Sequence, residues 1–149
     1  MEDSMGGRLV RDVIAGQQVI SLPQDATVTA AARLMKQSNV GALIVTENAR
    51  LVGLFTERDA VQRVLAEGLD PDTVPLSRVM SWGIVTITTD TSINRVLHIM
   101  QENNFRHVPV VDRLGAPVGM VSIRDALGDE LMNFQEDVGM NHPTTGDID

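Results

Sequence analysis

The chain has 149 residues, of which 43% are hydrophobic but only 3% aromatic, so its core must consist mainly of aliphatic side chains and methionine. It contains no cysteine, which excludes disulfides, thiolate nucleophiles and cysteine-based metal sites. The formal net charge of −8 opposes general binding to nucleic acid or anionic lipid, and no apolar run is long enough to span a bilayer. We therefore expect a soluble cytoplasmic protein with neither nucleic acid nor membrane as a partner.

The sequence repeats itself. Asp25 and Thr27 recur 65 positions later as Asp90 and Ser92. Further pairs keep this offset, or one of 66 after a single inserted residue: Met35 with Met100, Asn39 with Asn104, Val45 with Val110, Glu47 with Asp112, Gly53 with Gly119 and Asp59 with Asp125. Chance does not keep one register over so many residue types, so the chain holds two copies of one unit.

The copies have clear boundaries. We place the first at residues 8–68 and the second at 76–132. The stretch 69–75 is rich in Asp, Pro and Thr and predicts a linker. We expect residues 1–7 to be flexible, and likewise the acidic tail at 133–149.

The first copy predicts a short strand at 18–22, followed by a helix with Thr27 as its N-cap. Two apolar runs at 42–46 and 51–55, separated by polar residues, predict a hairpin, after which a second helix begins at Thr56. The apolar residues of the first helix have the spacing of one buried stripe: Val28, Ala31, Ala32 and Met35.

The second copy predicts the same order. A strand at 84–88 precedes a helix capped by Ser92, and a hairpin formed by 108–111 and 117–121 leads into a helix that begins at Ser122. Its first helix carries an equivalent stripe: Ile93, Val96, Leu97 and Met100. The predicted fold class is therefore α/β (α+β), with two tandem β-α-β-β-α units.

A unit of about sixty residues buries only a modest share of its surface. We therefore expect the two copies to pack through their sheets with pseudo-two-fold symmetry. The cleft between the copies is the natural place for a ligand.

This duplicated order, with Gly-h-h-Thr/Ser-x-x-Asp closing each copy (h, hydrophobic), resembles the CBS-domain pair, or Bateman module, in its stand-alone bacterial form. The resemblance covers roughly residues 8–130 and is carried by five segments: 40–45, 55–59, 79–81, 106–112 and 119–122. It implies a regulatory module that binds AMP, ADP, ATP, NAD(H) or S-adenosylmethionine between its copies. It also implies a homodimer that signals through the dimer itself or through a regulated partner protein.

Each copy closes with a hydroxyl and a carboxylate three residues apart, Thr56 with Asp59 and Ser122 with Asp125. One interpretation is a capping box, in which the two side chains satisfy free N–H groups at a helix start. The other is a nucleotide site, because a helix N-terminus suits phosphate and a carboxylate can accept both ribose hydroxyls.

The family resemblance implies the following roles. Asp59 and Asp125 hold the ribose diol, and Thr56 and Ser122 lie beside ribose or phosphate. Arg58 and Arg124 would bring positive charge to the phosphates. The family often has glycine where this sequence has Arg124, which puts the phosphate geometry of that cleft in question.

The copies differ at the start of one strand. Arg106 and His107 adjoin in the second copy, and the resemblance places this pair at the phosphates. The equivalent residues of the first copy, Gly41 and Ala42, carry no charge. This difference favours the cleft closed by Asp125 for a phosphorylated ligand.

The resemblance also implies apolar positions around the adenine. Ile20 and the stretch 40–42, which includes Gly41 and Ala42, belong to the Asp125 cleft, whereas Val85 and Phe105 belong to the Asp59 cleft. Ordinary core packing is the alternative for these side chains.

Three functions remain open from the sequence. The first is a non-catalytic module regulated by an adenine nucleotide, with no required cofactor. The second is a module for S-adenosylmethionine, and the third is a purely structural homodimerisation module with vestigial clefts. No nucleophile with a base and no metal-ligand cluster is recognisable, so we do not expect an enzyme.

Overall fold

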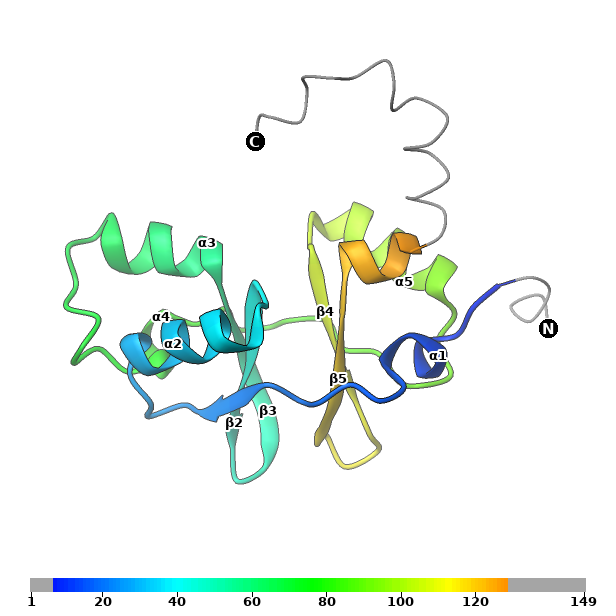
Figure 1. Cartoon of the computed structure of the whole chain (residues 1–149), viewed down its shortest axis with the longest axis horizontal. Helices are drawn as coiled ribbons and strands as arrows, with labels where there is room; N and C mark the ends of the chain where they lie inside the picture. Colours follow the sequence, from blue (N-terminus) through cyan, green and yellow to red (C-terminus); the bar gives the residue numbers. More distant parts are fainter. Residues whose placement is uncertain (1–6, 129–149) are drawn as a thin grey trace, which may run out of the picture.

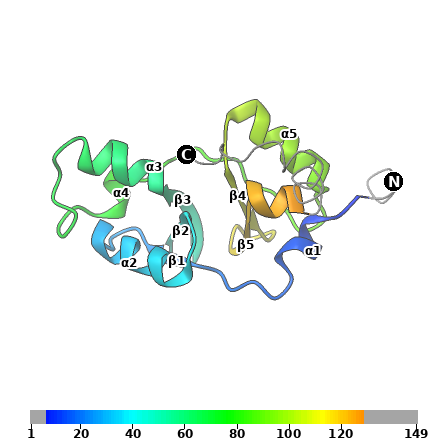
Figure 2. The same cartoon turned by 45° about the horizontal axis from the view of Figure 1, so that its top comes forward.

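The computed structural model describes residues 7–128, and most of the segments predicted to be flexible, 1–7 and 133–149, lie outside that range. The molecule has two halves side by side (Figure 1), with strands toward the middle and helices on the outside (Figure 2). The predicted α+β class with two tandem units is confirmed. In the described range no helix is both long and apolar enough to cross a bilayer.

The first half is built on a three-stranded sheet of order β1-β2-β3. β1 (Ser21–Pro23) runs parallel to β2 (Ala42–Glu47), and β3 (Arg50–Thr56) is antiparallel to β2. α2 (Val28–Ser38) connects β1 to β2, and its first turn is capped by Thr27, whose side chain accepts a hydrogen bond from the amide of Ala30. The stripe of α2 is buried as predicted except at Ala32, which is exposed.

The second half repeats this plan with a smaller sheet. α5 (Ile93–Asn103) begins at Ser92, whose side chain accepts a hydrogen bond from the amide of Arg95 at 3.1 Å. β4 (His107–Val111) and β5 (Pro117–Ser122) then form an antiparallel hairpin.

The first strand of each copy is shorter than predicted. In the second copy the predicted strand 84–88 is wrong, because only Ile87 pairs, through one isolated bridge to Val110. In the first copy the strand 18–22 is reduced to β1, Ser21–Pro23. In both copies the missing residues belong to a link that crosses from one half to the other, where no neighbouring strand is available to pair with them.

The closing helices begin where predicted. α3 (Glu57–Asp59) has Thr56 as its N-cap and continues as the π-helix η2 (Ala60–Leu65). Residues 123–128 are helical in the same way after Ser122.

Each copy begins with a further short helix that the sequence analysis did not predict, and this helix packs in the other half. α1 (Val10–Ile14) lies against β5, and α4 (Leu76–Val79) lies against β3. One core cluster accordingly joins α1 to the second copy: Val10, Ile14, Ile87, Ile93, Val96, Ile99, Met100, Val108, Val110, Val121 and Ala126. The other joins α4 to the first copy: Val28, Ala31, Met35, Leu43, Val45, Phe55, Val64, Val74, Leu76, Val79 and Met80.

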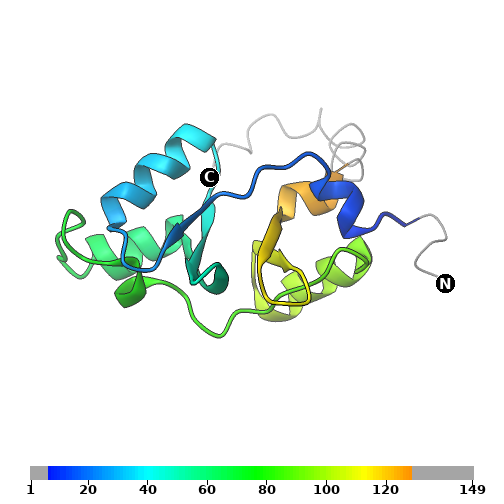
Figure 3. The same ribbon diagram turned by 90° about the horizontal axis from the view of Figure 1, so that it is seen from below.

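Two links therefore connect the halves, one after each exchanged helix. Figure 3 shows them on opposite sides of the molecule, the blue link leading to β1 and the green link leading away from α4. The halves also touch at their hairpin tips, where the amide of Leu51 donates to the carbonyl of Gly115 at 3.1 Å.

Candidate functional site

A cavity of about 1110 Å³ lies between the halves. Its walls come from the link before β1, the end of α2, the start of β2, the start of α3, and the segments 106–107 and 119–125. The structure thus brings together most of the predicted site residues: Ile20, Gly41, Ala42, Arg106, His107, Ser122, Arg124 and Asp125. We call this cavity the Asp125 cleft.

Asp125 and Ser122 form a reciprocal capping box at the edge of this cleft. The amide of Ser122 donates to Asp125 Oδ2 at 3.3 Å, and the amide of Asp125 donates to Ser122 Oγ at 3.1 Å. Asp125 is exposed, and within residues 7–128 its Oδ1 atom receives no hydrogen bond. The capping interpretation is therefore correct, but within residues 7–128 it leaves one carboxylate oxygen of this exposed residue with its acceptor capacity intact.

Asp59, the equivalent residue of the first copy, is in a different state. It is only 4% exposed, and it accepts from the amide of Thr56 at 3.0 Å. The Ser81 hydroxyl lies 3.1 Å and 3.2 Å from its two carboxylate oxygens, and Arg63 Nε lies 3.5 Å from Oδ1. The protein itself therefore occupies the acceptor positions of Asp59.

Sequence differences between the copies contribute to this contrast, and the clearest of them is at Ser81. Met80 contacts Gly53, and Ile14 contacts the equivalent Gly119, so Ser81 corresponds to Ala15, the residue after Ile14. Alanine has no hydroxyl to donate to Asp125. The sequence analysis did not compare these two positions. Comparing Ser81 with Ala15 would have predicted that Asp59 has a hydroxyl partner and that Asp125 does not.

Arginine side chains of the second half line the Asp125 cleft. The carbonyl of Arg106 accepts from the amide of Ile123 at 2.9 Å, which joins the start of β4 to the start of the last helix. The side chains of Arg106 and Arg124 are exposed and line the cleft. Since guanidinium stays protonated and can form paired hydrogen bonds, these two side chains suit phosphate.

His107 adds little positive charge of its own. Burial lowers its pKa, and the neighbouring Arg106 lowers it further, while Glu57 and Asp125 act in the opposite direction. The imidazole is therefore predominantly neutral at pH 7 and can donate or accept one hydrogen bond through its ring nitrogens.

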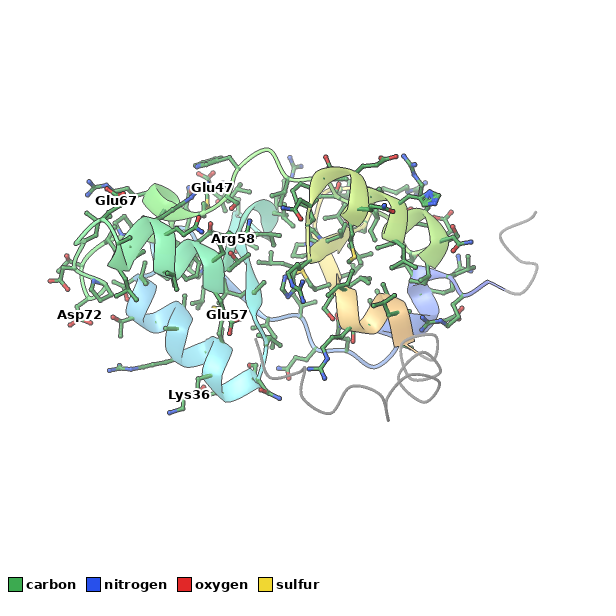
Figure 4. The ribbon with its side chains drawn as sticks, turned by 90° about the horizontal axis from the view of Figure 1, so that it is seen from above. Lys36, Glu47, Glu57, Arg58, Glu67 and Asp72 are labelled. Atoms are coloured by element: carbon green, nitrogen blue, oxygen red, sulfur yellow. The ribbon has the colours of Figure 1, made fainter. Side chains whose placement is uncertain are left out.

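Glu57 is a cleft residue that the sequence analysis missed. A Cβ added to Gly41 would lie 3.1 Å from Glu57 Oε1 and 3.6 Å from His107 Cε1, so side chains from both halves converge on Gly41. Figure 4 shows Glu57 and Arg58 at the end of their helix that faces the second half, and Glu67 and Asp72 at the far end. The position of Glu57 directly after Thr56, where the other copy has Ile123, is a signal that comparison of the copies could have used.

The remaining predicted residues lie outside the walls of the Asp125 cleft. Val85 and Phe105 are half-buried and pack against the core of the second half. Thr56 caps α3, and Arg58 is exposed in its first turn. Among residues 7–128 no three His, Asp or Glu side chains come close enough together to hold a metal ion.

Comparison with known proteins identifies the class that this fold and cleft define. The family model of the CBS domain matches residues 10–66 and 76–129, so the chain belongs to the CBS-domain family and is a CBS pair, a regulatory type of module. The CBS domain-containing protein YhcV of Bacillus subtilis is 36% identical over 116 residues, which cover 78% of this chain and 81% of that protein.

Solved structures agree. The CBS-domain protein ATU1752 from Agrobacterium tumefaciens has a TM-score of 0.74 and 28% identity, and the match covers 83% of this chain and 99% of that one. The CBS domain protein PAE2072 from Pyrobaculum aerophilum, solved in complex with AMP, has a TM-score of 0.75 and 26% identity, with 88% and 99% covered.

Proposed function

We propose that this chain is a non-catalytic regulatory module that binds one adenine nucleotide in the Asp125 cleft. The observation that carries the proposal is the exposed carboxylate of Asp125, with one oxygen free of hydrogen bonds within residues 7–128, in the same cavity as Arg106 and Arg124. Occupancy of the cleft would be signalled through a homodimer or through a regulated partner protein.

The cleft offers a suitable group for each part of such a ligand. Asp125 would accept hydrogen bonds from the ribose diol. Arg106 and Arg124 would bind the phosphate, with Ser122 beside it. Ile20 and Ala42 line an apolar part of the cavity where the base can lie, as ligand pockets generally combine apolar walls with a few polar groups.

The known relatives support an adenine ligand. The match covers 99% of the PAE2072 chain, and that protein was solved in complex with AMP. We take AMP as the first ligand to test, because the two exposed arginines of this cleft favour an anionic ligand over the cationic S-adenosylmethionine.

Isothermal titration with AMP, ADP, ATP, NADH and S-adenosylmethionine tests this function. We expect AMP to bind with a stoichiometry of one per chain, and Asp125→Ala to weaken binding about 10- to 100-fold, since a hydrogen bond to a charged group contributes about 1.5–3 kcal/mol. Glu102→Ala, which removes an exposed carboxylate on α5, is the matched control and should bind AMP as the wild type does. Absence of binding with all five ligands, together with a ligand-independent dimer in sedimentation, would overturn the proposal in favour of a structural dimerisation module.

A further inference from the structure

The link before β1 forms one wall of the Asp125 cleft. It leaves α1 in the core of the second half and enters β1 in the sheet of the first half (Figure 1). Four consecutive residues of this link line the cavity: Gln17, Gln18, Val19 and Ile20. The position of the link therefore sets the shape of the cleft.

The backbone of the link is attached at its two ends. The amide of Gln17 donates to the carbonyl of Ile14 at 2.8 Å, and the carbonyl of Ile20 accepts from the amide of Ile44 at 3.0 Å. Between these points the backbone of Gln18 and Val19 makes no hydrogen bond to any other part of residues 7–128.

The side chain of Gln17 supplies the attachment that the backbone lacks. Its Nε2 donates to the carbonyl of Met120 at 3.0 Å, and its Oε1 accepts from the amide of Met120 at 2.7 Å. Gly119 makes this approach possible, because a Cβ there would lie 3.0 Å from Gln17 Oε1 and 2.9 Å from Ile14 Cδ1.

The other half makes the same connection with backbone atoms. Leu54 is the residue equivalent to Met120, and its amide and carbonyl both pair with Ser81, at 3.2 Å and 2.8 Å. The amide side chain of Gln17 thus reproduces the pair of hydrogen bonds that the backbone of Ser81 makes. The link after α4 pairs with β3 through its main chain, whereas the link before β1 pairs with β5 through the side chain of Gln17.

We infer that Gln17 is a positioning residue for the Asp125 cleft. Its paired hydrogen bonds to Met120 hold the link against β5 and so keep Val19 and Ile20 in place as the wall on which the ligand packs. The identity of the ligand in this inference rests on the proposed function, whereas the attachment of the link by Gln17 does not.

The test compares AMP binding by wild type, Gln17→Met and Gln17→Asn. Methionine keeps the length of the side chain without its amide, and asparagine keeps the amide but is one methylene too short to reach Met120. We expect both variants to bind AMP about three- to tenfold more weakly, mainly through faster dissociation, because each loses two hydrogen bonds. Gln101→Ala on the exposed face of α5 is the control and should be unchanged.

Amide hydrogen exchange in the absence of ligand gives a second measure that a general loss of stability would not imitate. The Met120 amide should exchange at least tenfold faster in both Gln17 variants, while core amides of β4 keep their wild-type protection. The inference would be overturned if the Met120 amide of Gln17→Met exchanged at the wild-type rate. It would also be overturned if the wild type bound AMP and the Gln17 variants bound it with the same affinity. If the wild type binds no nucleotide, the proposed function fails, and Met120 exchange alone decides whether Gln17 holds the link.

Discussion

The same substitution at the two equivalent carboxylates should mainly reduce stability at Asp59 and mainly reduce AMP binding at Asp125. Asp59→Ala removes a buried acceptor from the Thr56 amide and from the Ser81 hydroxyl. Loss of a helix cap costs about 0.5–2 kcal/mol, and an unsatisfied buried donor costs about 1–3 kcal/mol. The ion pair with Arg63 contributes little, because that arginine is 52% exposed.

We therefore expect Asp59→Ala to lower the free energy of unfolding by about 2–4 kcal/mol. Asp125→Ala removes only the capping hydrogen bond that an exposed carboxylate accepts, and should lower the free energy of unfolding by about 0.5–1 kcal/mol. Urea unfolding followed by far-UV circular dichroism measures both values. AMP titration under native conditions should give the reverse order, with a large loss for Asp125→Ala and a small one for Asp59→Ala.

Two results would refute this reasoning. Equal destabilisation by the two substitutions would show that the Ser81 hydroxyl does not distinguish the carboxylates. A loss of AMP affinity in folded Asp59→Ala as large as that in Asp125→Ala would show that Asp59 also meets the ligand.

Other substitutions test other parts of the structure. Burial lowers the pKa of His107, so below its ordinary value of about 6.5 the unfolded chain binds more protons than the folded one, and the contribution of His107 to stability is lost as pH falls. The difference in unfolding free energy between wild type and His107→Gln should therefore shrink from pH 7.5 to 5.5. A difference that does not depend on pH would contradict this. Gly41→Val would place methyl groups against Glu57 and inside the cleft, so we expect at least a tenfold loss of AMP affinity by calorimetry, with folding by circular dichroism unchanged. Ser92→Ala removes the N-cap of α5 and should cost about 0.5–2 kcal/mol in urea unfolding, whereas a change at exposed Asn94 in the same helix should cost less.

The repeat in the sequence predicts much of the fold because each copy is locally consistent. The apolar stripe of α2 after Thr27 and the hairpin that ends at Thr56 leave little freedom for another arrangement. The family resemblance, carried by the same residues, predicts which side chains face the cleft, and Arg106 and Asp125 do line one cavity.

The exchange of α1 and α4 is not predictable in the same way. Each helix is a single turn or slightly more, with too few apolar residues to form a stripe that a sequence pattern identifies. Which half each helix joins depends on contacts between segments that lie far apart in the sequence. The predicted strand at 84–88 fails for the same reason, since it lies on a link.

Gln17 and Glu57 escaped the sequence analysis because it contrasted the copies at one place only, Arg106 and His107 against Gly41 and Ala42. A search for shared motifs finds what the copies have in common, such as the carboxylates Asp59 and Asp125. The functional difference between the copies lies instead at positions where they disagree, among them Ser81 against Ala15.

The exchanged helices have a consequence for how the halves depend on each other. Neither copy contains all of its own core, because Val10 and Ile14 complete the second half and Leu76 and Met80 complete the first. A single copy expressed alone would lack the helix that completes its core here, α4 for the first copy and α1 for the second. The two copies thus exchange these short helices within one chain. Because the two links lie on opposite sides of the molecule, a rotation of one half against the other would act on both links.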